Sequence, residues 1–108
     1  MRAVRIHEYG GPEVLKYEDI EVPAPRPDEV LIRVKACALN HLDLWIRQGK
    51  PRVKTLPHIL GSDISGEVVK AGELCWRVQP GQRVLLSPGL SCRQCEACVS
   101  GRDNQCLQ

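Results

Sequence analysis

Apolar and polar residues alternate along several short stretches of the chain, which is the pattern of β-strands with one buried face. The alternation is clearest where Val30, Ile32 and Val34 occupy every second position. Glycines and prolines interrupt the pattern every few residues, as they do in domains built from short strands. The stretches that share this pattern, and are expected as strands, are 2–7, 14–22, 28–36, 64–70 and 82–87.

The segment 40–48 has helical rather than alternating spacing. Leu42 and Trp45 fall on one face of a helix there, Asn40 is a residue type that caps helix starts, and Gly49 is one that ends helices. We therefore expect one short helix in an otherwise mainly β chain. Trp45 could wall a substrate cleft, but its helical spacing favours a place in the core.

The composition fits one small globular domain. The chain has 108 residues, 43% of them hydrophobic, and a formal net charge of only +2. So small a charge argues against nucleic acid as a partner, and no apolar run approaches the roughly 20 residues that span a membrane. The N-terminus lacks the apolar stretch of a secretory signal. These features predict a cytoplasmic protein.

Six cysteines are many for a chain of this length, and in a reducing compartment they indicate metal binding before disulfides. Four of them, Cys92, Cys95, Cys98 and Cys106, lie within fifteen residues in a segment with no hydrophobic periodicity. Two-residue spacers let thiolates of one turn converge on an ion, and the longer gap lets the chain return with the fourth. The spacing predicts a closed tetrahedral Zn²⁺ site with a structural role.

Two other chemistries remain open for this segment. Three cysteines at this spacing also begin an iron–sulfur motif, although that motif has its fourth cysteine after about three residues, and here seven intervene. Local disulfides are the other alternative. Arg93 and Arg102 either offset the negative charge of four thiolates or are solvated surface residues. Cys37 and Cys75 lie outside the cluster and are expected as small buried side chains.

With these residues placed, the sequence resembles the zinc-containing alcohol dehydrogenases of the medium-chain dehydrogenase/reductase superfamily, over their N-terminal GroES-like domain only. The resemblance implies a partly open β-barrel with a four-cysteine zinc lobe at 88–108, so that residues 1–108 form one substrate-side domain. Five stretches carry it: the cysteine spacing at 92–106, the strand at 28–36, the helix start at 40–43, the glycine pattern at 61–72 followed by Cys75, and the Pro-Gly turn at 78–84.

The departures from the family pattern bear on mechanism. The family's catalytic zinc takes a Cys and a His from this region, and those positions are Asn40 and Ser62 here. The adjacent acid is Asp63 where the family usually has Glu, and the hydroxyl residue of the proton relay falls on Leu42. Amide and hydroxyl groups are poor substitutes for thiolate and imidazole as zinc ligands. The resemblance therefore implies that the structural zinc is kept and the catalytic zinc is lost.

The Asn-x-x-Asp pair formed by Asn40 and Asp43 is similar to the zinc-free quinone oxidoreductases of the same superfamily. That similarity implies that Asn40 lines the cleft near the nicotinamide and that Asp43 holds the loop. The same pair also fits a helix cap, and the two interpretations are compatible. A second metal held by His41 with Cys37 or Asp63 is the remaining alternative.

The sequence contains no Gly-x-Gly-x-x-Gly, the loop that binds dinucleotide phosphates. In the family that loop belongs to a C-terminal Rossmann domain. We therefore expect NAD(P) only in a full-length enzyme, of which these 108 residues are a part or a separately encoded half, inactive alone. The resemblance implies a small carbonyl, alcohol or quinone substrate and a homo-oligomeric full-length enzyme. The alternative is a stand-alone zinc-binding module without enzyme activity.

Overall fold

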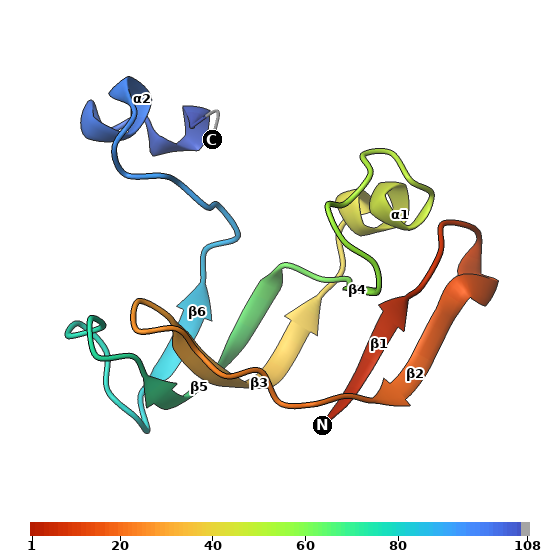
Figure 1. Cartoon of the computed structure of the whole chain (residues 1–108), viewed down its shortest axis with the longest axis horizontal. Helices are drawn as coiled ribbons and strands as arrows, with labels where there is room; N and C mark the ends of the chain where they lie inside the picture. Colours follow the sequence, from red (N-terminus) through yellow and green to blue (C-terminus); the bar gives the residue numbers. More distant parts are fainter. Residues whose placement is uncertain (107–108) are drawn as a thin grey trace.

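Two antiparallel three-stranded sheets make up most of the protein, in a computed structural model that describes residues 1–106 (Figure 1). One sheet has the order β2-β1-β4 and the other β3-β5-β6. The strands are β1 (Arg2–Ile6), β2 (Leu15–Asp19), β3 (Val30–Ala38), β4 (His58–Ile59), β5 (Asp63–Ala71) and β6 (Arg83–Leu86). The helices are α1 (His41–Arg47) and α2 (Glu96–Val99), with single 3₁₀ turns η1 (Pro12–Val14) and η2 (Asp103–Gln105).

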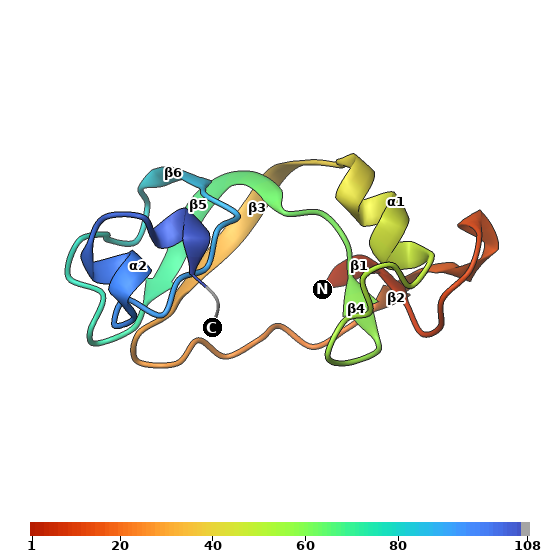
Figure 2. The same cartoon turned by 90° about the horizontal axis from the view of Figure 1, so that it is seen from above.

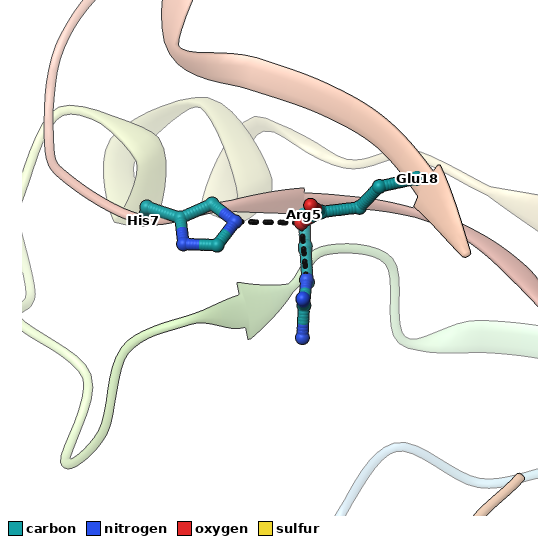
Figure 3. A network of polar contacts seen from close by, with 3 residues as sticks. All are labelled: Arg5, His7 and Glu18. Carbon is teal, nitrogen blue, oxygen red and sulfur yellow. Dashed lines mark hydrogen bonds and ion pairs between the residues drawn. The ribbon is translucent and has the colours of Figure 1, made fainter. Parts of the chain in front are cut away.

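A polar cluster on one face of the β1–β2 hairpin stabilises the first sheet. Glu18 on β2 accepts hydrogen bonds from Arg5 and from His7, the latter at 2.6 Å between Nε2 and Oε1 (Figure 3). The Arg5 bond, and after it the His7 bond, hold the pKa of Glu18 below its ordinary value of 4.5. The cluster therefore links the hairpin strands through side chains as well as through the ladder.

The second sheet contains a close backbone approach at Gly66. Gly66 on β5 is paired with Val34 on β3, next to an irregularity in the register between Val34 and Ala36. A methyl group at Gly66 would lie 2.5 Å from the carbonyl oxygen of Arg33 and 2.6 Å from Cγ2 of Ile32. Glycine is required here because a side chain would collide with the neighbouring strand.

Little of the apolar surface is buried within residues 1–106. Ile6, Val14 and Val68 are the buried hydrophobic residues of this part of the chain, whereas Leu85 is 84% exposed. The radius of gyration is 15.5 Å, larger than the roughly 13 Å of a compact chain of this length. Figure 2 shows the two sheets as separate bodies joined by their connections. Exposed apolar surface of this kind is typical of a face that contacts further polypeptide.

The expected strands and the helix start at Asn40 are confirmed to within three residues. Three expectations about burial are wrong. Cys75 is only partly buried. Trp45 is 53% exposed and Cys37 is exposed, because no strand of residues 1–106 packs extensively across those faces. The short strand β4 and the single-turn helix α2 carry no periodicity and were not expected. None of the helices in residues 1–106 has the length and apolar character of a membrane span.

We predict that Gly66→Ala lowers the free energy of unfolding by about 1–3 kcal/mol, because the added methyl group overpacks the β3–β5 ladder. Urea unfolding followed by tryptophan fluorescence measures this. Gly89→Ala is the matched control, since the nearest atom to its new methyl group is Ser87 Oγ at 4.0 Å. Equal shifts in the two variants would contradict the steric explanation.

Candidate metal centre and the Asn40 network

The four C-terminal cysteines converge in space. Their sulfur atoms all lie within 4.8 Å of one another, with 3.5 Å between Cys95 and Cys98 and 3.8 Å between Cys92 and Cys98. These separations are far longer than the roughly 2.05 Å of a disulfide bond, and all six cysteines of the chain are free thiols. The predicted cluster is therefore formed by the fold itself.

Short local elements bring these sulfurs together. Cys95 is the N-cap of α2 and Cys98 lies within it, so one helical turn aligns both thiols. The helix ends at Val99 with Ser100 as its C-cap; Gly101 follows with a φ of 80°, and the N–H of Arg102 donates to the carbonyl oxygen of Ala97 at 2.8 Å. This is the closure that a glycine after a helix permits. It turns the chain back so that η2 delivers Cys106 to the cluster.

Backbone N–H groups donate hydrogen bonds to some of the sulfurs, so the four thiols lie in different environments. The N–H of Cys95 donates to Cys92 Sγ at 3.3 Å, and the N–H of Cys92 donates to Cys106 Sγ at 3.4 Å. Hydrogen bonds from the backbones of Gln94 and Cys95 lower the pKa of Cys92 to about 6. Burial, followed by the neighbouring Cys95 thiol, raises the pKa of Cys98 to about 12.

The donor set of this cluster suits one soft divalent metal. Four thiols whose sulfur atoms lie within 4.8 Å of one another match the tetrahedral sulfur shell of structural zinc and leave no open position. Oxygen-preferring ions such as Mg²⁺ or Ca²⁺ do not favour such a set. Within residues 1–106, the four cysteines are the one group of three or more His, Cys, Asp or Glu side chains close enough to share an ion.

A second polar network surrounds the start of α1. Asp43 is 4% exposed, and its two carboxylate oxygens accept hydrogen bonds from the N–H groups of Asn40 at 2.7 Å and Gly61 at 2.8 Å. The Asn40 bond is one half of a capping box. Gly61 has a φ of 95°, and a methyl group there would lie 2.6 Å from Cys37 Sγ. Asp43 therefore joins the helix start to the connection between β4 and β5.

Asn40 also points its side chain at the entrance of β5. Its Nδ2 donates to Asp63 Oδ2 at 2.6 Å. Ser62 is exposed and directly precedes Asp63. The structure thus joins Asn40, Asp43 and Asp63 in one hydrogen-bonded network, with Ser62 next to Asp63 in the chain. Asp63 also lines an open hollow of about 370 Å³, together with Cys37 and apolar residues of β3, β5 and β6.

Sequence reasoning missed two residues of these sites. Gly61 was quoted only as part of a glycine pattern, although its N–H is half of the Asp43 contact. Arg93 was considered only for its charge, yet its backbone adopts a left-handed φ of 61°. The sequence signal for the Gly61 contact was the presence of a glycine, which adopts positive φ easily. Nothing in the sequence indicates that the backbone of an arginine will be left-handed.

The two sheets and the four-cysteine cluster define the chain as a mainly β domain that carries a four-thiol lobe. Residues 26–108 match the family model of the alcohol dehydrogenase GroES-like domain. The chain belongs to this family, which confirms the resemblance inferred from the motifs and the GroES-like fold. The Cys-rich lobe and the Asn40 network both lie within the matched range.

Named relatives of the chain are oxidoreductases. It is 44% identical over 93 residues to human quinone oxidoreductase, covering 84% of this chain and 28% of that protein. A crystal structure of an NAD-dependent alcohol dehydrogenase superposes with a TM-score of 0.95 at 50% identity, covering 100% of this chain and 32% of the other. A cobalt- and zinc-bound thermostable alcohol dehydrogenase from Pyrobaculum aerophilum gives a TM-score of 0.93 at 37% identity, covering 99% and 32%. The chain spans about a third of the length of these proteins.

We predict that Asp43→Asn lowers the free energy of unfolding by about 1–3 kcal/mol, because an amide cannot accept from both backbone N–H groups. Differential scanning calorimetry measures the loss. The control is Asp19→Asn, whose aspartate side chain is 78% exposed and should be replaceable at little cost. If the two variants unfold alike, Asp43 does not hold the joint.

Proposed function

We propose that this chain is the substrate-side domain of an NAD(P)-dependent oxidoreductase that keeps a structural zinc but lacks a catalytic one. One contrast carries the proposal. The four thiols of the lobe converge within 4.8 Å of one another, whereas the Asn40 amide is engaged with Asp63. Family membership supports the reaction class. The residues around Asn40 support the absence of a catalytic zinc.

Cys92, Cys95, Cys98 and Cys106 would hold the zinc. The ion would join four thiolates in a closed shell, so that its binding energy is also the folding energy of residues 88–106. Such an ion contributes rigidity and touches no substrate. The separation of the lobe from α1 in both views supports a purely structural role (Figures 1 and 2).

The chain's own residues would act on substrate near the start of α1. Asn40 keeps one side-chain N–H for the oxygen of a carbonyl, alcohol or quinone group, because its other side-chain N–H is held by Asp63. Asp43 would fix the loop through its two backbone contacts. Asp63 and Ser62 occupy neighbouring positions at the entrance of β5 and would border the same cleft.

NAD(P) would be held by a Rossmann domain outside these residues. The cofactor supplies or accepts the hydride when bound. Three features support this part of the proposal: the absence of Gly-x-Gly-x-x-Gly from the sequence, the 28% share of the human relative that the chain covers, and the exposed apolar residues such as Leu85. The full-length enzyme would be homo-oligomeric and the isolated chain inactive.

The lobe also favours a second function, a stand-alone zinc-binding module without enzyme activity. Its supporting observation is that the four-thiol cluster forms entirely within residues 92–106. The two proposals differ in what a cofactor domain adds, since only the first requires one for activity.

We predict one zinc ion per chain for the purified 108-residue protein, measured by inductively coupled plasma mass spectrometry with thiol titration before and after chelation. Cys98→Ser should lose that zinc because one of four ligands is removed, while Cys75→Ser, outside the cluster, should retain it. Two zinc ions per chain would contradict the loss of the catalytic site, and none would contradict the structural zinc.

We predict that the protein with its cofactor domain reduces quinones or enones with NAD(P)H, and that the 108-residue chain does not. In the active protein, Asn40→Ala should lower kcat by about tenfold or more, since the variant lacks a polar group that is positioned beside the substrate. Asn104→Ala is the matched control on the exposed surface of η2. No hydride transfer with the cofactor domain present would favour the stand-alone module.

A further inference from the structure

One non-glycine residue of the described chain has a left-handed backbone. Four glycines share positive φ values: Gly49, Gly61, Gly81 and Gly101. The fifth such residue in residues 1–106 is Arg93, with a φ of 61°. For residues with a Cβ atom this conformation costs free energy, because the Cβ approaches the following carbonyl oxygen. An arginine in this place is therefore a departure that needs a reason.

The conformation of Arg93 shapes the turn between the first two cysteines of the lobe. With Arg93 left-handed, the N–H of Cys95 donates to Cys92 Sγ at 3.3 Å. Successive backbone N–H groups of such a turn form a concave nest for negative charge. The turn thus aims a backbone donor at a sulfur that would carry the charge of a metal-bound cluster.

We propose that Arg93 is a positioning residue that sets how tightly the lobe holds zinc, through its backbone conformation rather than its charge. This inference rests on the proposed structural zinc. The left-handed turn must be held whenever the four thiolates surround an ion, so its cost is subtracted from the binding energy of the metal. A residue that adopts this conformation easily would bind the ion more tightly.

The charge of Arg93 is a weaker candidate for this role. Its side chain is exposed, and its guanidinium forms none of the ion pairs recorded between residues 1 and 106. An exposed charge interacts weakly with its surroundings because water and salt screen it. The backbone of the turn that Arg93 shapes, in contrast, donates directly to a sulfur through the N–H of Cys95.

The test compares neutral substitutions that differ in their tolerance of the left-handed region. Arg93→Asn and Arg93→Gln both carry an uncharged amide, but asparagine enters this region readily and glutamine does not. We expect Arg93→Asn to have a zinc Kd at least about threefold lower than Arg93→Gln, and Arg93→Gly to bind about tenfold more tightly than the parent chain. Arg93→Val, which is β-branched, should bind most weakly.

Competition with a chromophoric chelator measures the zinc Kd, and the thiolate-to-cobalt charge-transfer absorption reports whether four sulfurs bind. Arg93→Lys, which keeps charge and conformational cost, should match the parent within about twofold. Urea unfolding in excess chelator should be alike for Arg93→Asn and Arg93→Gln, which separates metal positioning from general stability.

The outcomes distinguish the role of Arg93 from the proposed structural zinc on which it rests. A parent chain that binds no zinc overturns the proposed structural site. One zinc per chain with equal affinities for Arg93→Asn and Arg93→Gln overturns the inference alone. An affinity order that follows charge, with arginine and lysine together above every neutral residue, overturns it as well.

Discussion

The buried carboxylate of Asp43 is the contact on which the arrangement of the two sheets depends. It accepts from the start of α1 and from Gly61, which lies between β4 of one sheet and β5 of the other. With Ile6, Val14 and Val68 as the buried apolar residues of the described chain, hydrophobic burial contributes little to this joint. A satisfied buried carboxylate can fix geometry here because leaving either N–H unpaired would cost the full desolvation of that group.

The same joint determines what surrounds Asn40. Because Asp43 occupies the N–H of Asn40 and Gly61, the asparagine side chain is left free to reach Asp63 at the entrance of β5. A helix cap and a position beside the substrate are therefore compatible roles of one residue, each using different atoms. Under the proposed function, this polar network would orient a substrate by hydrogen bonds rather than by metal coordination.

The lobe obeys a different constraint from the sheets. Residues 88–106 have no hydrophobic periodicity, and their order comes from α2, the turn at Gly101 and N–H donors aimed at sulfur. If the lobe binds the proposed zinc, its stability would depend on that ion, since metal binding and local folding share one free energy. The lobe around α2 lies apart from α1 (Figure 1), so under the proposed function rigidity and chemistry would reside in different parts of the domain.

The sequence alone determined the strands, the start of α1 at Asn40 and the grouping of the four cysteines, because each is written in local spacing that survives without tertiary context. Tertiary structure decided the exposure of Trp45 and Cys37, the pairing of His7 with Glu18, and the strand β4, which exists only because β1 lies beside it. It also decided the left-handed turn at Arg93. Burial, partners and backbone strain depend on what the rest of the chain brings alongside, and no residue's own propensity encodes that.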